Sequence, residues 1–173
     1  MIASAPIAPP LQNSSRVGRR DEALFNIDAT RKFFGRTTAC LTEEDSTFAP
    51  APGTMTAAQH VAHVAQSVDW FREGVWGRGW EMDFEAMWAE IEPHRSLLGA
   101  RNWLDDALAR FRDQVASLSD EDLARPLPPN PIFGELPTYH VVEALLDHNA
   151  HHRGSLAVIA RLRGRTPEMP YAD

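Results

Sequence analysis

The feature that most constrains the fold is the segment 138–163, which is predicted to form one long helix and carries three histidines within five residues. His148 and His152 lie four positions apart, so on a helix their side chains point in nearly the same direction. Leu145 and Ile159 fall on the same face. The two imidazoles are therefore predicted to lie on the apolar side of the helix, toward the protein interior.

Two histidines at this spacing favour a shared metal ion, because buried ring nitrogens without partners are energetically costly. The alternative is a pair of hydrogen-bonded core residues, which is the usual role of a single histidine on an apolar face. His151 lies nearer the edge of the apolar stripe. We expect it to support a ligand from behind or to face solvent, and a pairing of His148 with His151 is the weaker alternative.

The composition narrows the class of protein. The chain has 173 residues, enough for one domain with a proper core, and a net charge of −7 that argues against nucleic-acid binding. Cys40 is the single cysteine, so neither an internal disulfide nor a cysteine metal site is expected. No apolar run reaches the roughly 18 residues of a membrane span, and no secretory signal is visible near the N-terminus. A cytoplasmic protein without membrane contact is expected.

The rest of the pattern predicts an all-α four-helix bundle. Residues 1–20 are expected to form an extended arm, and 21–173 a single domain. Besides 138–163, long helices are expected over 21–41, 57–76 and 93–117, with Pro93 at the start of the third. The connector 77–92 is interpreted as a loop with a helical turn that covers the core, or else as a pocket wall. A short helical turn is expected near 119–122, followed by a proline-rich loop over 125–137.

The helix predicted over 57–76 carries two more histidines. His60 and His63 both fall on one flank of its apolar stripe, about 60° and 120° from the centre. Periodicity slightly favours His60 as the buried residue. A helix in a four-helix bundle meets two neighbours, however, so the geometry of the sequence leaves this pair open.

Several motifs together carry a family resemblance. They are Thr56-Ala57-Ala58-Gln59-His60-Val61-Ala62-His63, Asp69-Trp70-Phe71, His148-Asn149-Ala150-His151-His152-Arg153-Gly154 and Leu162-Arg163-Gly164-Arg165-Thr166-Pro167. With them the chain resembles the DinB/YfiT-like superfamily over about residues 20–171. The resemblance implies an up-down-down-up four-helix bundle that is often a homodimer. It also implies a divalent metal bound by three histidines, which match His63, His148 and His152 here. His60 is then a fourth ligand, a general base or an incidental neighbour.

The expected chemistry follows from such a site. Three neutral imidazoles leave a divalent ion (zinc, nickel or iron) with open positions, which is typical of a catalytic centre. The resembled superfamily includes thiol S-transferases that use a low-molecular-weight thiol as cosubstrate, and thiol-dependent isomerases. The resemblance thus implies a metal-dependent enzyme in which a thiol or water is activated toward an electrophilic small-molecule substrate. His60 or His151 is the candidate to relay a proton.

Trp70, Trp80 and Trp88 are candidates for the wall of an apolar substrate pocket, although tryptophan in a bundle is more often part of the core. Arg153 points away from His148 and is expected to make a structural contact. The competing function is a stress-response dimer that binds metal or a ligand without turning it over.

Overall fold

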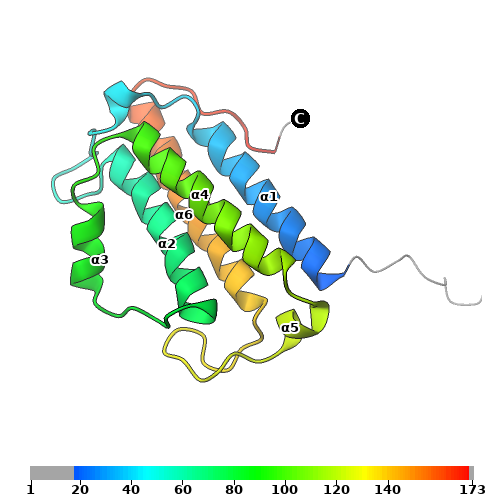
Figure 1. Ribbon diagram of the computed structural model, residues 1–173. Helices are drawn as coiled ribbons and strands as arrows, with labels where there is room; N and C mark the ends of the chain where they lie inside the picture. The colour runs from blue at the N-terminus through cyan, green and yellow to red at the C-terminus, as the bar shows by residue number, and fades with distance from the viewer. Residues whose placement is uncertain (1–17, 172–173) are drawn as a thin grey trace, which may run out of the picture.

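The computed structural model describes residues 18–171, which form a bundle of four long helices with three short helical segments (Figure 1). The long helices are α1 (Arg19–Thr38), α2 (Ala57–Trp76), α4 (Leu97–Ala116) and α6 (His140–Leu162). The short ones are η1 (Glu43–Asp45), α3 (Phe84–Ile91) and α5 (Asp120–Ala124). Across the described residues, the only strand-like pairing is an isolated bridge between Pro126 and Pro137. The predicted all-α four-helix bundle is confirmed.

The order of the helices in space brings distant parts of the chain together. In Figure 1, α1 and α6 run upward while α2 and α4 run downward, the up-down-down-up arrangement. α2 packs against α4 and α6, and α1 packs against the same two helices. The histidines of α2 therefore belong to a helix that lies directly beside the histidines of α6.

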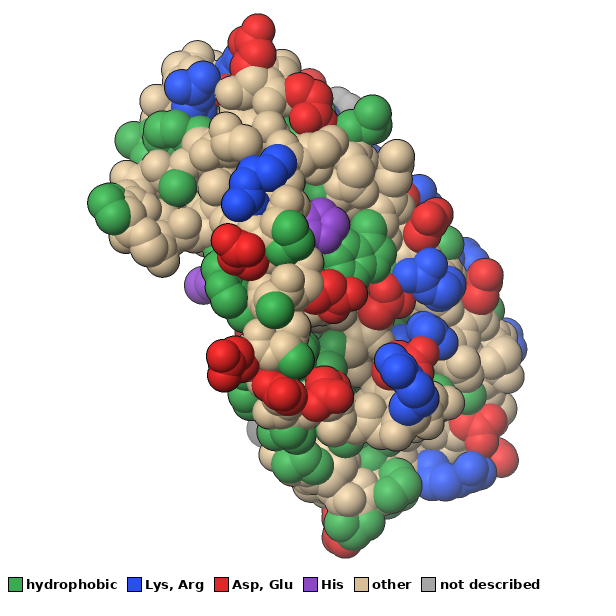
Figure 2. All heavy atoms as spheres, turned by 60° about the vertical axis from the view of Figure 1, so that its left-hand side comes forward, with side chains coloured by type: hydrophobic (Ala, Val, Ile, Leu, Met, Phe, Trp, Pro, Cys, Tyr) green, Lys and Arg blue, Asp and Glu red, His purple; other side chains and the backbone are tan. Residues whose placement is uncertain are grey.

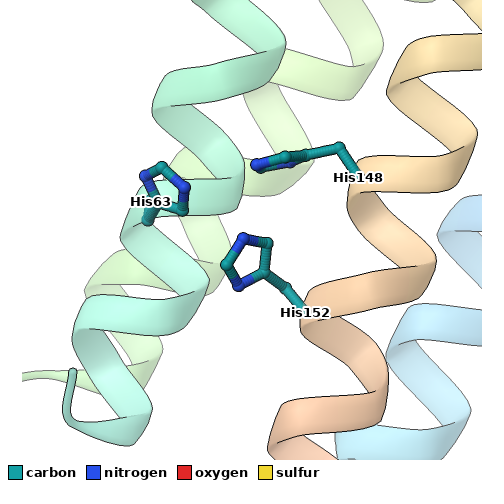
Figure 3. A group of neighbouring side chains, drawn as sticks. All are labelled: His63, His148 and His152. Carbon is teal, nitrogen blue, oxygen red and sulfur yellow. The ribbon is translucent and has the colours of Figure 1, made fainter. Parts of the chain in front are cut away.

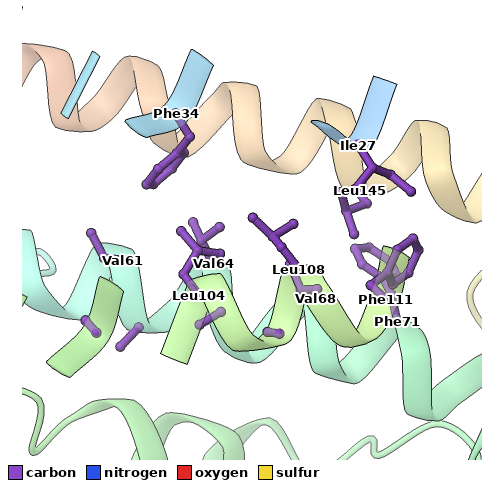
Figure 4. Packing of buried hydrophobic residues seen from close by; sticks show 14 of the residues in the cluster. Ile27, Phe34, Val61, Val64, Val68, Phe71, Leu104, Leu108, Phe111 and Leu145 are labelled. Carbon is purple, nitrogen blue, oxygen red and sulfur yellow. The ribbon is translucent and has the colours of Figure 1, made fainter. Parts of the chain in front are cut away.

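The core lies between the four long helices and fixes their positions (Figure 4). Each large side chain buried there contributes roughly 1.5–3 kcal/mol relative to an exposed one. The buried side chains that Figure 4 labels are Ile27, Phe34, Val61, Val64, Val68, Phe71, Leu104, Leu108, Phe111 and Leu145. Because α2 and α6 both contribute to this core, packing holds the two helices side by side.

The start of α2 agrees with the expected residue because a capping box fixes it. The Thr56 hydroxyl accepts a hydrogen bond from the Gln59 amide at 3.2 Å, and the Gln59 side chain accepts one from the Thr56 amide at 2.9 Å. This reciprocal pair satisfies two amide groups that a helix start leaves free. It also sets the direction in which His60 and His63 leave the first two turns.

The predicted start of the third long helix at Pro93 is wrong. Pro93 lies in the turn after α3, and α4 begins at Leu97 with Ser96 as its cap, whose hydroxyl accepts a bond from the Gly99 amide at 3.0 Å. The carboxylate of Glu43 also accepts a bond from the Leu97 amide at 3.3 Å. A contact between residues so distant in the chain leaves no local signal in the sequence.

The connector 77–92 contains a true helix, where a single helical turn was expected. Asp83 caps α3 by accepting a hydrogen bond from the Ala86 amide at 3.0 Å. Ile91 is buried on the side toward the bundle, whereas Phe84 and Trp88 are exposed. α3 therefore packs on α2, and part of the apolar surface of α3 itself remains exposed to solvent.

The N-terminal part of the chain can be compared with the expected arm and the expected bounds of the first helix. The arm expected over residues 1–20 falls outside the described residues up to position 17, and Arg19 and Arg20 already belong to α1. α1 ends at Thr38, three residues before the expected end. Of the helices in the described part, none has the length and apolar character that crossing a membrane requires.

A buried carboxylate ties the loop before α2 to the end of α6. Asp45 is fully buried; it accepts hydrogen bonds from Nε of Arg163 at 2.8 Å, from Nε of Arg165 at 3.1 Å and from the amide of Thr42 at 2.9 Å. Burial alone raises the pKa of Asp45, but these bonds outweigh it and hold the pKa at about 2. The carboxylate is therefore ionised at neutral pH and anchors two segments that are far apart in sequence.

Candidate metal centre

Three imidazoles from two helices converge between α2 and α6 (Figure 3). His63 comes from α2, and His148 and His152 come from successive turns of α6. One ring nitrogen of each residue lies within 4.8 Å of one nitrogen of each of the others. These three residues, called the histidine cluster below, are the residues that the family resemblance implied.

The ring positions show that the cluster is compact. Ring centroids are 4.5 Å apart for His148 and His152, 4.8 Å for His63 and His152, and 5.1 Å for His63 and His148. The spacing of four residues on α6 places one pair on a single face, and the packing of α2 against α6 adds the third ring. The cluster thus depends on both local helix geometry and tertiary packing.

Burial keeps these imidazoles in the form that binds metal. It lowers the pKa of His148 to about 4 and that of His152 to about 3, and the neighbouring histidines add to both shifts. Burial also lowers the pKa of His63. A ring held neutral at pH 7 offers a lone pair to a cation without first releasing a proton.

The polar atoms around the cluster fit a cation. Nδ1 of His148 is buried and has no hydrogen-bond partner within the described residues. Such a nitrogen is costly unless a proton donor or a metal ion satisfies it. Metal–nitrogen bonds of about 2.1 Å hold three nitrogens around one ion at most about 3.6 Å apart, so the three rings must move closer together than the 4.8 Å of this structure to bind one ion. A set of three neutral nitrogens suits zinc, nickel or iron.

His60 contacts the cluster from one side. Its Nδ1 lies 3.1 Å from Nδ1 of His152, a hydrogen bond between two rings. This contact leaves Nε2 of His152 for an ion, and Figure 3 shows one ring nitrogen of His152 pointing toward His63 and His148. Burial lowers the pKa of His60 to about 4 as well. Since Nδ1 of His60 is engaged by a cluster member, the structure favours a role beside the ligands over that of a fourth ligand.

His60 and His63 differ in a way that helix periodicity does not predict. Both residues are half-buried, so burial does not separate them. They differ in position: His63 faces both histidines of α6, whereas His60 lies one turn earlier and reaches only His152. The angle at which α2 packs on α6 determines which of the two histidines faces the α6 pair. That angle cannot be predicted from the sequence of α2 alone.

His151 lies on the outside of α6. Its side chain is exposed, its ring meets that of His152 edge-on at 4.9 Å, and its backbone carbonyl accepts a bond from the Ser155 hydroxyl at 3.3 Å. The cluster contains His152 and not His151, so the alternative pairing of His148 with His151 does not form. His151 remains the outer candidate for proton transfer.

The predicted tryptophans fall into two environments. Trp80 belongs to an aromatic cluster with Phe71 and Phe133, and Phe71 in turn meets the His148 ring at 6.4 Å. Trp70 stacks edge-on with Trp80 at 4.7 Å. These rings form an apolar wall at the His148 end of the centre. Sequence analysis did not identify Phe133, because it lies in the proline-rich loop far from α2.

Trp88 and Arg153 lie away from that wall. Trp88 of α3 lines a groove that also contains His60. Arg153 donates a hydrogen bond to the Tyr171 hydroxyl at 2.9 Å and lies over the rings of Phe33 and Tyr171. Its expected structural role is confirmed: it holds the C-terminal tail against α1 and α6.

The contact between His60 and His152 leads to a testable expectation. Replacing His60 with alanine removes the partner of His152 Nδ1, and loss of such a supporting contact typically lowers metal affinity about 10–100-fold. His60→Asn places an amide oxygen near the position of Nδ1 and is expected to restore most of the affinity. Competition with a chromogenic chelator measures both. Equal affinity of His60→Ala and the unmodified protein would show that the contact does not support the ligand.

The chain is similar to known proteins in both sequence and structure. A family model described as the DinB superfamily matches residues 26–156, while no curated protein matches the chain. The fold is similar to that of a DinB-like protein from Bacillus cereus ATCC 10987, with 21% identity and a TM-score of 0.65 over 87% of this chain and 94% of that one. The DinB-like protein YjoA from Bacillus subtilis has 17% identity and a TM-score of 0.60, over 87% and 96%.

A third similar structure carries a functional description. YfiT from Bacillus subtilis, described as a probable metal-dependent hydrolase with an unusual four-helix bundle topology, has 17% identity and a TM-score of 0.66 over 92% of this chain and 95% of that one. At these identities the structural matches establish the fold.

Proposed function

This chain belongs to the DinB superfamily, and on that premise we propose that it is a metal-dependent enzyme of the thiol S-transferase type. In this proposal His63, His148 and His152 hold one divalent ion. A low-molecular-weight thiol is the nucleophile, and an electrophilic small molecule is the substrate. Water in place of the thiol gives the hydrolytic form of the same chemistry.

The observation that carries the proposal is the convergence of three neutral imidazoles from α2 and α6, of which His152 is buried and the other two are half-buried. Structural zinc sites are usually closed by four protein ligands, whereas three-ligand sites keep a position for a reactant. Core packing also joins α2 and α6, so an ion at the cluster is not the sole link between them. A catalytic use of the cluster explains its composition better than a structural one.

The chemistry divides between the ion and the protein. A divalent ion held by three histidines supplies a Lewis acid that lowers the pKa of a bound thiol or water. The hydrogen bond between the His60 and His152 rings orients the His152 ring. The Phe71 ring, packed against Trp80 and Phe133, gives His148 an apolar neighbour. His151 is the side chain left to accept a released proton, because the contact with His152 engages the Nδ1 lone pair of His60.

Hydrolysis is the second candidate, and one comparison favours it. YfiT is described as a probable metal-dependent hydrolase, and its fold resembles this one along nearly the whole chain. The same three-histidine geometry serves either nucleophile. Transferase and hydrolase therefore share the metal centre and differ in what occupies its open position.

The test measures turnover by metal-free protein after reconstitution with zinc, nickel or ferrous iron. The expected result is consumption of an aryl halide electrophile that requires both the metal and an added thiol, and that is lost in His63→Ala. Ester hydrolysis without thiol would select the hydrolase. The proposal fails if reconstituted protein binds metal, gains many degrees of thermal stability from it, and turns over neither substrate class. That outcome would support the stress-response dimer.

A further inference from the structure

A groove opens beside the histidine cluster, between α3, the start of α2 and the last turns of α6. It has a volume of about 710 Å³, and its walls include Pro50, Met55, His60, Trp88, Ser155 and Val158. His60 lies in the groove and also contacts His152, so one imidazole separates the groove from the cluster. The groove is therefore within reach of a reactant held at the metal centre.

The lining of the groove is uncharged. Among residues 18–171, no Asp, Glu, Lys or Arg side chain lines it, and most of the lining residues are apolar. Val158 is 56% exposed and Trp88 is 45% exposed, so two large apolar side chains face solvent there. A ligand that covers these two side chains is stabilised because their apolar surface is removed from water. A charged group in the groove would lose its hydration without finding an oppositely charged partner.

The surroundings add an electrostatic preference. Exposed acidic residues gather on and beside α3, as Figure 2 shows in red on the face that this helix covers. They are Glu81, Asp83, Glu85, Glu90 and Glu92. Glu92 pairs with Arg95 at 3.8 Å, and the other four, together with the net charge of −7, disfavour the approach of an anion.

His60 gives the groove one directed polar group. When His152 uses Nε2 for an ion, its Nδ1 carries the proton and donates it to Nδ1 of His60. His60 then accepts at Nδ1 and carries its own proton on Nε2. As a result, the only ring N–H of His60 left to meet a ligand is a neutral hydrogen-bond donor.

From these observations we infer that the groove binds the substrate electrophile as an uncharged, apolar molecule, an aryl or short alkyl body with a neutral hydrogen-bond acceptor directed at His60. This inference rests on the proposed function and names its substrate class. Thiols such as glutathione carry several charges and do not suit this lining, so the nucleophile enters from elsewhere. Trp88 and Val158 are the residues that set the size of the apolar body.

The test uses two probes with the same body, naphthalene-1-carboxamide and naphthalene-1-carboxylate, titrated by calorimetry into zinc-loaded protein. The carboxamide is expected to bind saturably, with a dissociation constant of about 1 mM or tighter for a ligand of this size. The carboxylate is expected to bind at least about tenfold more weakly, because its charge is not paired in the groove. Val158→Arg should weaken carboxamide binding by about tenfold or more.

Matched controls separate the groove from the fold and from the metal. Leu162 lies one turn after Val158 on α6, is 59% exposed and does not line the groove, so Leu162→Arg should leave carboxamide binding unchanged. Trp88→Ala should weaken it without altering zinc affinity. The inference is overturned if the carboxamide does not bind, if the carboxylate binds equally well, or if Val158→Arg and Leu162→Arg behave alike. If zinc still binds, any of these results overturns the groove inference and leaves the metal-centre proposal standing. If the protein binds the carboxamide but not zinc, the metal-centre proposal alone is contradicted.

Discussion

Replacing His152 with alanine is expected to lower the affinity for a divalent ion by at least about 100-fold. Loss of a residue that only supports a ligand already costs 10–100-fold, and His152 is the member of the cluster that contacts both other members and His60. The substitution removes one of three nitrogens and also leaves His60 without its partner. Competition titration of metal-free protein with a chromogenic chelator measures the change directly.

His151 provides the matched control for this prediction, because it is the adjacent histidine on the same helix and is exposed. His151→Ala is expected to change metal affinity by less than about threefold. Similar losses in the two variants would indicate that the ion is bound at the surface of α6. Unchanged affinity in His152→Ala would exclude His152 as a ligand.

Replacing Asp45 with alanine is expected to destabilise the protein by about 3 kcal/mol. Breaking a buried ion pair by removing one partner typically costs about 3–5 kcal/mol. The lower end applies here because Arg163 and Arg165 are 37% and 32% exposed and regain some hydration. For a chain of this size the loss corresponds to a decrease in Tm of roughly 10 °C. Thermal and urea unfolding measure it.

The neighbouring Glu44 is the control for Asp45. It approaches Arg165 at 3.4 Å, but its side chain is 83% exposed, so the pair contributes little in water. Glu44→Ala should change the free energy of unfolding by less than about 0.5 kcal/mol. Equal effects of the two substitutions would show that the buried carboxylate does not anchor the loop.

The pH dependence of stability provides a second test of the contribution of the buried Asp45 carboxylate. The pKa of Asp45 is lowered from 3.8 to about 2, so the folded protein binds its proton less readily than the unfolded chain. This contribution is complete above about pH 5 and is lost as the pH falls through about 2. The stability difference between the protein and Asp45→Asn should therefore shrink by about 2 kcal/mol over that range. A difference that stays constant with pH would contradict the ionised state of Asp45.

Local signals in the sequence explain why most of the fold could be predicted. The capping box of Thr56 and Gln59 fixes the start of α2, and Gly164, with φ of 71°, ends α6 where a residue with positive φ is needed. The start of α4 could not be found in this way, because Ser96 and the distant Glu43 define it together. Pro93 is a plausible helix start by its residue type, but the contact with Glu43 helps to place the start of α4 at Leu97.

For the histidine cluster too, local spacing predicts one part and tertiary packing determines the other. The spacing of His148 and His152 alone placed them on one buried face, as the structure has them. The choice between His60 and His63 needed the angle at which α2 meets α6, and only the family resemblance supplied it. The groove beside Trp88 combines three segments that are remote in sequence. No periodicity in any one of them indicates that they meet.

The most direct test of a metal centre at the histidine cluster is anomalous diffraction, at the absorption edge of the bound metal, from crystals of protein reconstituted with one divalent ion per chain. We expect one anomalous peak about 2.0–2.1 Å from a ring nitrogen of each of His63, His148 and His152, with at least one further position held by water or a thiol. A peak elsewhere on the chain, or an ion fully enclosed by protein ligands, would contradict the account.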